Sequence, residues 1–319
     1  MRFSRDRRRF LGATAGGVLA AACARSRPSP VLLLDAPTYE VDFADLIGRG
    51  LRELGVEVGG RRVLLKPNLV EFRPGAPVNT DPRVVAGAAS ALLRAGAAAV
   101  TVGEGPGHRR DTSYLVEETG LAEALRSDKV PFVDLNHDET RWTKLASNLT
   151  GLGELALPAE VLQADLLVSM PKLKTHHWAG MTCAMKNLFG VVPGAVYGWP
   201  KNPLHVRGIT NAIIDLTTTL RPRLSIVDAV VGMEGDGPIM GSARRVGTVV
   251  MGTDPVAVDM VCARLMGFVP ERLDYLRHAR SEGLFPADIE LRGERVERYS
   301  APFATLPAFE TARDENLAG

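Results

Sequence analysis

Short, continuously apolar runs recur along the chain and alternate with segments in which apolar residues follow a helical spacing. The apolar runs lie at residues 31–34, 63–65, 98–102, 132–133, 166–168, 224–227 and 247–251. Runs without a polar residue at every second position are typical of strands buried on both faces, as in a parallel sheet. They predict strands that are covered by helices on both sides.

The intervening segments predict those helices. Apolar residues repeat at helical spacing, or helix-capping signals occur, over residues 42–54, 82–95, 112–125, 209–220 and 254–266. Asp81 and Asp254 each precede a proline, which is typical of an N-cap followed by the first helical position. The alternation predicts an α/β fold with a mainly parallel sheet flanked by helices.

The chain length permits one large domain or two modest ones. The segment at residues 144–158 is polar and contains glycine, which suggests a first α/β lobe over residues 28–150 and a second over 151–319, with a cleft between them. A single domain with an internal loop at this point is the alternative. Residues 181–207 show weak periodicity and several glycines and prolines, which predicts a long, ordered, functional loop.

The N-terminal segment, residues 1–27, is typical of a targeting signal. Arg7-Arg8-Arg9-Phe10-Leu11 fits a twin-arginine pattern, and the apolar stretch that follows, residues 11–22, is shorter than the roughly 20 residues that span a bilayer. We therefore expect export by the twin-arginine machinery to the periplasm or another extracytoplasmic compartment.

Two fates are open for the end of this signal. Leu19-Ala-Ala-Ala-Cys23 is one residue longer than the usual lipoprotein pattern. Lipidation at Cys23 would anchor the protein to a membrane, whereas cleavage beside Ala22 or Ala24 would release it. The two remaining cysteines, Cys183 and Cys262, form no C-x-x-C pair, which argues against a cysteine-bound iron–sulfur cluster.

The charge balance argues against a nucleic-acid partner. Of 38 Lys and Arg and 37 Asp and Glu, seven arginines and one aspartate lie in residues 1–27, which leaves 31 basic and 36 acidic residues and a net charge of −5. Nucleic-acid binding depends on a basic surface that neutralises phosphates. The remaining lysines therefore matter as a local cluster.

That cluster follows the apolar run at 166–168. Lys172, Lys174, His176 and Lys186 lie within fifteen positions, and cations just past a central strand can converge on a crevice. We expect Lys172 and Lys174 to point the same way from an extended segment and to bind a small anionic molecule. A charged surface loop is the alternative, although Trp178 and other apolar residues interrupt the charges.

Two residues of the cluster are candidates for catalysis. A desolvated lysine among other cations has a lowered pKa and can act as a base or nucleophile, which points to Lys174. Imidazole titrates near neutral pH, which makes His176 the candidate general acid–base. Either His176 or its neighbour His177 could instead bind a metal.

Other strand ends carry polar residues that would complete the site. Lys66 and Asn68 follow one apolar run, and Asn187 lies next to Lys186; with Lys172 these form the predicted substrate-binding set. Lys66 could equally form a structural ion pair, because a buried lysine requires a partner. Glu104, between two glycines, is either a base or metal ligand or a solvated carboxylate in a turn.

An acidic segment follows the run at 224–227. Asp228, Glu234 and Asp236 supply oxygen ligands that suit a divalent cation such as Mg²⁺, or they pair with the lysines. The sequence does not identify which other cofactor, if any, the protein binds.

Seven segments of the sequence together resemble the domain of unknown function 362 family. They are Lys66-Pro67-Asn68, Asn79-Thr80-Asp81, Gly103-Glu104-Gly105, Pro171–His176, Met185–Gly190, Gly232–Pro238 and Asp254–Asp259. The resemblance covers roughly residues 60–265 and implies a shared fold and site without naming a reaction. Some members carry a ferredoxin-like domain, whose cysteines this chain lacks.

Three classes of function remain open. The first, which we favour, is an exported α/β enzyme that acts on a small anionic substrate through the Lys/His cluster. The second is an extracytoplasmic solute- or cofactor-binding protein without turnover. The third is a membrane-tethered assembly factor, which requires lipid on Cys23.

Overall fold

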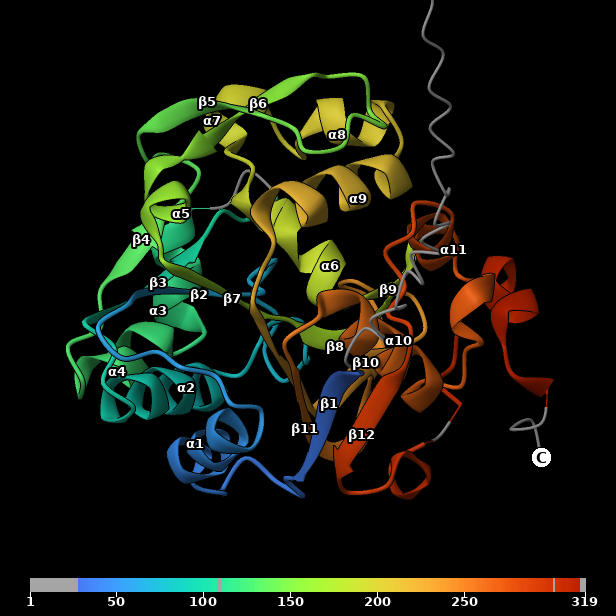
Figure 1. The fold of residues 1–319 in the computed structure, drawn as a ribbon, viewed down its shortest axis with the longest axis horizontal. Coiled ribbons are helices and arrows are strands. Elements are labelled where there is room, and N and C mark those ends of the chain that lie inside the picture. Colours follow the sequence, from blue (N-terminus) through green and yellow to red (C-terminus); the bar gives the residue numbers. More distant parts are fainter. Residues whose placement is uncertain (1–27, 108–110, 301, 316–319) are drawn as a thin grey trace, which may run out of the picture.

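The computed structural model describes residues 28–107, 111–300 and 302–315. Its centre is a ten-stranded sheet with the order β12-β1-β11-β10-β7-β2-β3-β4, to which β8 adds beside β10 and β9 beside β8 (Figure 1). The strands of this sheet are β1 (Ser29–Asp35), β2 (Arg62–Pro67), β3 (Ala99–Glu104), β4 (Phe132–Asp134), β7 (Leu166–Met170), β8 (Lys172–His176), β9 (Gly180–Thr182), β10 (Leu224–Glu234), β11 (Ser242–Gly252) and β12 (Ile289–Gly293).

The sheet is mainly parallel, which confirms the predicted fold class. Strands β10, β7, β2, β3 and β4 run parallel to one another, as do β1 and β12. Only the pairs that involve β11 and the pair β8–β9 are antiparallel. Each of the seven apolar runs in the sequence forms one of these strands.

Helices connect the strands. Those outside residues 181–207 are α1 (Phe43–Glu53), α2 (Pro82–Arg94), α3 (Thr112–Glu118), α4 (Leu121–Arg126), α5 (Ala159–Gln163), α9 (Ile209–Leu220), α10 (Pro255–Leu265) and α11 (Asp274–Ser281). Asp81 and Asp254 accept backbone N–H groups as the predicted N-caps. The expected helix over 112–125 is divided at Gly120, whose positive φ of 77° ends α3 before α4 begins.

Residues 181–207 differ from the long loop that the sequence suggested. They form the end of β9 and then α6 (Ala184–Asn187), the 3₁₀ turn η1 (Leu188–Val191), α7 (Gly194–Tyr197) and α8 (Asn202–Val206). Further short 3₁₀ turns are η2 (Pro270–Arg272), η3 (Val296–Arg298) and η4 (Pro307–Ala312). Helices this short lack a detectable period, because they complete barely one turn.

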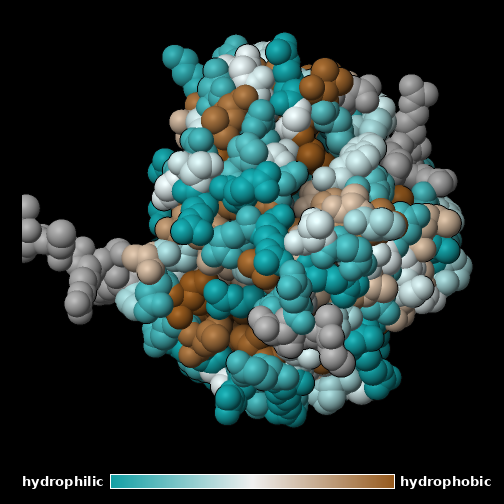
Figure 2. Space-filling model, turned by 90° about the vertical axis from the view of Figure 1, so that its right-hand side faces the viewer, coloured by the Kyte–Doolittle hydropathy of each residue, from teal (hydrophilic) through white to brown (hydrophobic). Residues whose placement is uncertain are grey.

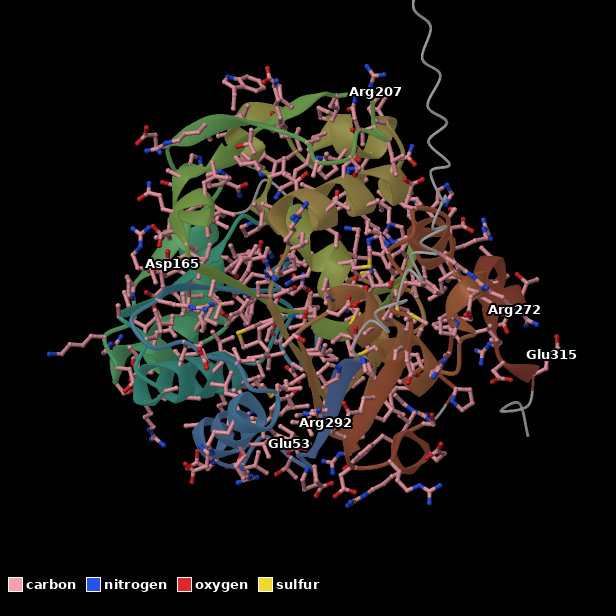
Figure 3. All side chains as sticks on the ribbon, in the orientation of Figure 1. Glu53, Asp165, Arg207, Arg272, Arg292 and Glu315 are labelled. Carbon is pink, nitrogen blue, oxygen red and sulfur yellow. The ribbon has the colours of Figure 1, made fainter. Side chains whose placement is uncertain are left out.

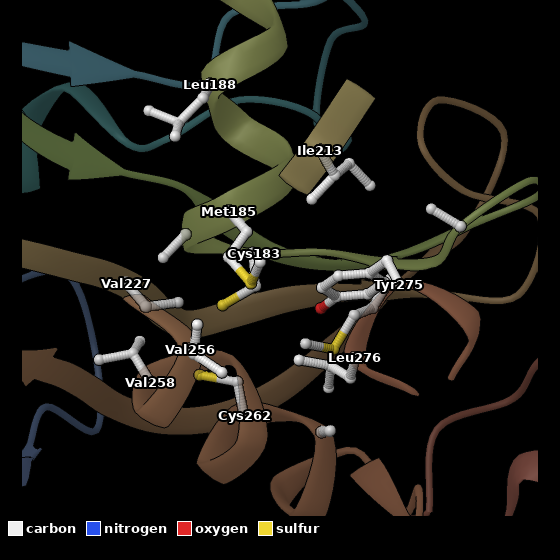
Figure 4. Close-up of a cluster of buried hydrophobic side chains, with 14 of the residues drawn as sticks. Cys183, Met185, Leu188, Ile213, Val227, Val256, Val258, Cys262, Tyr275 and Leu276 are labelled. Atoms are coloured by element: carbon white, nitrogen blue, oxygen red, sulfur yellow. The ribbon is translucent and has the colours of Figure 1, made fainter. Parts of the chain in front are cut away.

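The sheet is buried on both faces, which explains its apolar strands. In β1, Val31 and Leu33 belong to one core cluster, whereas Leu32 and Leu34 belong to the other. Helices α1 and α2 cover the second cluster, and α6, α9 and α10 cover the first (Figure 1). In the first cluster, side chains of α6, α9, α10 and α11 gather with Val227 of β10 (Figure 4).

The large sheet takes strands from both sides of residue 150. The polar segment around this point forms part of a separate two-stranded hairpin of β5 (Thr140–Lys144) and β6 (Glu154–Pro158). The division into lobes at residues 28–150 and 151–319 stays a prediction.

Hydrogen bonds and ion pairs connect elements at the edge of the molecule. Arg292 of β12 donates from Nη1 to the carbonyl of Glu53 at the end of α1, at 2.7 Å, and Arg272 lies 3.9 Å from Glu315 near the C-terminus (Figure 3).

One face of the molecule is mostly hydrophilic with separate apolar patches (Figure 2). Within the described ranges, no helix is long and apolar enough to cross a membrane. The twin-arginine signal and Cys23 lie outside those ranges.

The order of the parallel strands places a crevice beside β2. From β2 the chain proceeds to β3 and β4 on one side, and then returns to place β7 and β10 on the other side. The carboxyl ends of β2 and β7 therefore lie at a topological switch point, where open α/β sheets bind ligands.

The contact between α1 and α2 yields a test of this packing. Gly87 of α2 lies against the start of α1, where an added Cβ would overlap the Cβ of Phe43 and approach its carbonyl carbon to 2.9 Å. We expect Gly87→Ala to lower the free energy of unfolding by about 1–3 kcal/mol, measured by denaturant titration, because this contact includes backbone. Gly48→Ala is the matched control, since Arg52 Nη1 at 3.7 Å is its nearest neighbour, and it should raise stability by up to ~1 kcal/mol. Equal stabilities for the two variants would contradict this packing.

Candidate functional site

A cavity of about 260 Å³ lies at the carboxyl edge of the sheet. Its polar lining residues are Asn68, Glu104, Lys174, His176, His177, Thr182, Lys186, Asn187, Lys201 and His205. Its apolar lining includes Phe189 and Trp178, and the indole of Trp178 is 58% exposed. The described lining residues thus include three lysines and one carboxylate.

That carboxylate already has a cationic partner. Lys66, fully buried at the end of β2, donates to Glu104 Oε2 at 2.5 Å and to Asn187 Oδ1 at 3.2 Å. Glu104 also accepts the backbone N–H groups of Leu69 and Gly105. Burial lowers the pKa of Lys66, and the charge of Glu104 opposes this shift. The structure therefore gives Lys66 the ion pair that the sequence left as one of two alternatives.

Gly190 makes room for this ion pair. A Cβ at residue 190 would overlap both Glu104 Oε1 and Lys66 Nζ. The carbonyl of Gly190 also accepts the N–H of Gly105 at 3.1 Å, which joins η1 to the end of β3. The backbone itself closes over the ion pair, so no side chain fits between them.

Two amides connect the ion pair to the cavity. Asn187 donates from Nδ2 to the carbonyl of Lys66 at 2.9 Å and to Ser169 Oγ at 3.1 Å, which fixes its Oδ1 as an acceptor. Asn68 donates to this oxygen at 3.3 Å. The opposite atom, Asn68 Oδ1, is buried and accepts no hydrogen bond among the described residues. It is a free acceptor in the cavity wall.

The three cavity lysines differ in their hydrogen bonds. Lys174 donates to the carbonyl of Val78 at 2.7 Å, and Lys201 donates to the carbonyls of Gly105 and Phe189 at 2.7 and 2.9 Å. Lys186 Nζ lies 3.8 Å from the centroid of the Phe189 ring and has no hydrogen-bond acceptor within the described part of the chain. Among the described residues, the contact of this amine is with the face of the Phe189 ring.

Burial weakens the charge on all three amines. It lowers the pKa of Lys186 to about 7, helped by the charge of Lys66, and that of Lys201 to about 7 against the opposing charge of Glu104. Burial and then the charge of Lys172 hold the pKa of Lys174 well below its ordinary value. Desolvation and mutual repulsion thus favour neutral amines, as the sequence predicted for Lys174.

His176 has a defined proton position. Its Nδ1 accepts the backbone N–H groups of Trp178 at 3.1 Å and Ala179 at 3.3 Å, which assigns the proton of the neutral ring to Nε2. Burial, together with the charge of Lys186, lowers the pKa of His176 well below its ordinary value. A ring that stays neutral at physiological pH donates a hydrogen bond, so the argument for His176 from titration near pH 7 does not apply.

The other two histidines have the opposite arrangement. His177 Nδ1 lies 3.0 Å from the carbonyl of Gly237, and His205 Nδ1 lies 3.3 Å from that of Lys201. A ring nitrogen facing a carbonyl must donate, so Nε2 of each neutral ring is an acceptor. Burial lowers the pKa of His205, and the charge of Lys186 contributes. The cavity therefore contains imidazoles that donate and imidazoles that accept.

Lys172, predicted to bind the same small anion as Lys174, does not line this cavity, although its charge lowers the pKa of Lys174. Its amine donates to Asp228 at 2.5 Å and to the Tyr39 hydroxyl at 2.7 Å, and it lines a different cavity. The pairing of β8 with β10 is irregular between the partners of these two lysines, Asp228 and Met233. Within β8 only the core residue Leu173 separates the two lysines, yet their amines line different cavities.

The predicted metal ligands Asp228, Glu234 and Asp236 do not form a cluster. Asp228 is buried and bound to Lys172, and Glu234 Oε2 accepts the N–H of Ala304 at 2.9 Å. Among the residues that the structure describes, no group of three or more His, Cys, Asp or Glu is placed to hold a metal ion, so this trio does not form one. Of the two alternatives for the acidic residues, pairing with a lysine applies to Asp228.

Asp259 stabilises the site from outside the cavity. It accepts the N–H groups of Ala184 and Met185 at the start of α6, at 2.7 and 3.3 Å, and the hydroxyl of Tyr275 at 3.0 Å. Burial raises the pKa of Asp259 to about 7. Because α6 carries Lys186 and Asn187, Asp259 positions these side chains and does not itself line the cavity.

Sequence reasoning missed Lys201 and His205. They lie in the segment that was expected to be a loop, where no motif marks them. The available signal was a lysine and a histidine among aromatic residues and prolines, at Tyr197-Gly-Trp-Pro-Lys201 and Pro203-Leu-His205. This composition resembles that of the predicted cluster around Trp178.

The buried ion pair generates a test of the site's electrostatics. Glu104→Gln leaves Lys66 without a counter-charge, and we expect the free energy of unfolding to fall by about 3–5 kcal/mol. Because the folded state then favours the neutral amine, the unfolded state binds more protons, so stability should rise with pH. Denaturant titrations between pH 6 and 9 measure this trend. Adding Lys66→Met to Glu104→Gln should restore part of the loss, and a double variant no more stable than the single one would contradict the pairing.

Comparisons with known proteins agree with the motifs. The family described as domain of unknown function (DUF362) matches residues 63–264. Thylakoid-associated protein sll1697 from Synechocystis sp. is 32% identical over 276 residues, which are 82% of this chain and 82% of that protein.

Two solved structures align more distantly. The lactate racemase apoprotein from Thermoanaerobacterium thermosaccharolyticum aligns at a TM-score of 0.44 and 15% identity over 69% of this chain and 54% of its own, so this chain spans about half of that protein. A protein from Thermotoga maritima aligns at 0.38 and 15% over 66% of this chain and 56% of its own. The family match covers well over half of the chain, which therefore belongs to the domain of unknown function 362 family.

Proposed function

We propose that this protein is an enzyme that acts on a small organic anion bound in the cavity. The observation that carries the proposal is the charge composition of the lining. Lys174, Lys186 and Lys201 line the cavity, and the one lining carboxylate in the described part of the chain, Glu104, is already paired with Lys66. A ligand that brings negative charge would restore the protonated form of these amines and would be held by them.

The size and walls of the cavity favour a compact ligand. Its volume of about 260 Å³ is slightly below the roughly 300–1,000 Å³ of typical small-molecule sites. Phe189 and Trp178 offer apolar surface beside the amines. These features suit a carboxylate- or phosphate-bearing molecule of a few carbon atoms.

The protonation states favour turnover over simple binding. A protein that only holds an anion is served by permanently charged groups such as arginine, and the described lining residues include none. Lys186 and Lys201, with pKa values of about 7, can both give and take a proton at neutral pH. His176 supplies a neutral N–H that can stabilise a developing oxyanion.

Anion binding should be coupled to proton uptake. At pH 8 the amines of Lys186 and Lys201 are mostly neutral, so a bound anion that raises their pKa must draw protons from solution. We expect the affinity for a dicarboxylate such as malonate to rise as pH falls from 8 to 6.5, by up to about tenfold per pH unit for each proton taken up. Calorimetry in two buffers of different ionisation enthalpy measures the proton count.

Variants of the lysines provide the controls. Lys186→Met and Lys201→Met should each reduce the proton uptake and the affinity, whereas Lys144→Met, on the exposed hairpin, should change neither. Uptake that is unchanged in both cavity variants would contradict the assignment of these amines. His176→Ala separates enzyme from carrier: once a turned-over anion is found, loss of turnover with retained binding supports the enzyme, and loss of binding alone supports the carrier.

Export remains part of the proposal, since Arg7-Arg8-Arg9-Phe10-Leu11 precedes a short apolar stretch. We expect intact mass spectrometry of the protein isolated from its producing cell to show cleavage beside Ala22 or Ala24, or a diacylglyceryl adduct on Cys23. Replacing Arg7-Arg8 by two lysines should leave the precursor uncleaved inside the cell, because the machinery reads the arginine pair. Normal processing of that variant would exclude the twin-arginine route. An adduct on Cys23 would favour the membrane-tethered class.

A further inference from the structure

Among the described lysines around the cavity, Lys186 differs in having an uncommitted amine. Lys66 is paired with Glu104, Lys174 is bonded to the Val78 carbonyl, and Lys201 is bonded to two carbonyls. Lys186 Nζ rests 3.8 Å from the centroid of Phe189 and meets no acceptor in the described part of the chain. Its lone pair, when the amine is neutral, is therefore available to a ligand.

We infer that Lys186 is a nucleophile that forms an imine with the carbonyl carbon of a 2-oxo acid or a similar carbonyl-bearing anion. The inference deepens the proposed function and rests on it. The other amines explain why the carbonyl compound would carry an acidic group: Lys174 and Lys201 line the same cavity and can hold a carboxylate beside the carbonyl. The polarity of the cavity thus matches a molecule with both groups on a short carbon chain.

The step balances without a redox partner. The neutral amine of Lys186 adds to the carbonyl carbon, and the nitrogen loses a proton while the carbonyl oxygen gains one. Loss of that oxygen as water then leaves a carbon–nitrogen double bond. A neutral amine is required for the first step, and burial keeps about half of Lys186 in that form near pH 7.

Neighbouring groups are placed to move the protons. Lys186 Nζ lies over the ring of Phe189, whose centroid is 5.7 Å from that of His205, and its charge contributes to the lowered pKa of both His176 and His205. Nε2 of His205 is an acceptor for the proton leaving nitrogen, and the Lys201 ammonium is a donor to the departing oxygen. The protonated imine is a cation and would keep the contact with the face of Phe189 that the amine now has.

Reductive trapping on the intact protein tests whether Lys186 forms the imine. The protein is incubated with pyruvate or 2-oxoglutarate and then with sodium borohydride, followed by intact mass measurement and peptide mapping. We expect one reduced adduct per chain, located on Lys186, and at least tenfold less with acetone, which has a carbonyl but no charge. Lys186→Arg should abolish the adduct, whereas Lys144→Arg should leave it unchanged.

A binding measurement keeps the outcomes distinct. Quenching of Trp178 fluorescence by the same oxo acid, with Trp178→Phe as its control, reports occupancy of the cavity mouth. Occupancy without an adduct on Lys186, or with adducts spread over other lysines, overturns the imine and leaves the anion site intact. If malonate binds but the oxo acids neither quench Trp178 fluorescence nor form an adduct, the imine is also excluded. Failure of every anion to bind overturns both proposals. Circular dichroism of Lys186→Arg confirms that the loss of adduct is not loss of fold.

Discussion

Desolvation of amino groups at the carboxyl edge of the sheet is the constraint on which the site depends. An ammonium group loses most of its hydration when buried, and only a close carboxylate compensates for the loss. Glu104 does so for Lys66, and Asp228 does so for Lys172. Lys174, Lys186 and Lys201 have no such partner among the described residues. Burial therefore lowers the pKa of each amine and favours its neutral form.

The fold brings these amines together because strand order and chain order differ. Lys66 lies near the end of β2, and Lys174 lies in β8, directly after β7. The two parallel strands β2 and β7 are neighbours despite about a hundred residues between them. The segment after β9 then folds back over the strand ends as short helices, with α6 capped by Asp259 from α10. A site with contributions from β2, β3, β8 and this segment has little freedom to move one group without the others.

The sequence predicted the sheet well, because continuous apolar runs follow directly from burial on both faces. It also identified Lys66, Asn68, Glu104, Lys174, His176, Lys186 and Asn187, which the structure brings to one place. It failed where the outcome depends on three-dimensional pairing. Lys172 pairs with Asp228 and lines a different cavity from Lys174, although only Leu173 separates the two lysines in β8. Lys201 and His205 stayed hidden because turns of four or five residues leave no period.

Gly190 has a consequence for how this chain can diverge. Any larger residue there would collide with both members of the Lys66–Glu104 pair, so a mutation at this codon requires the two side chains to move and disturbs the ion pair. Losing the pair first would expose Lys66 to the full penalty of an uncompensated charge. Substitutions at these three positions, which lie in separate parts of the gene, are therefore coupled: the effect of each depends on the residues at the other two.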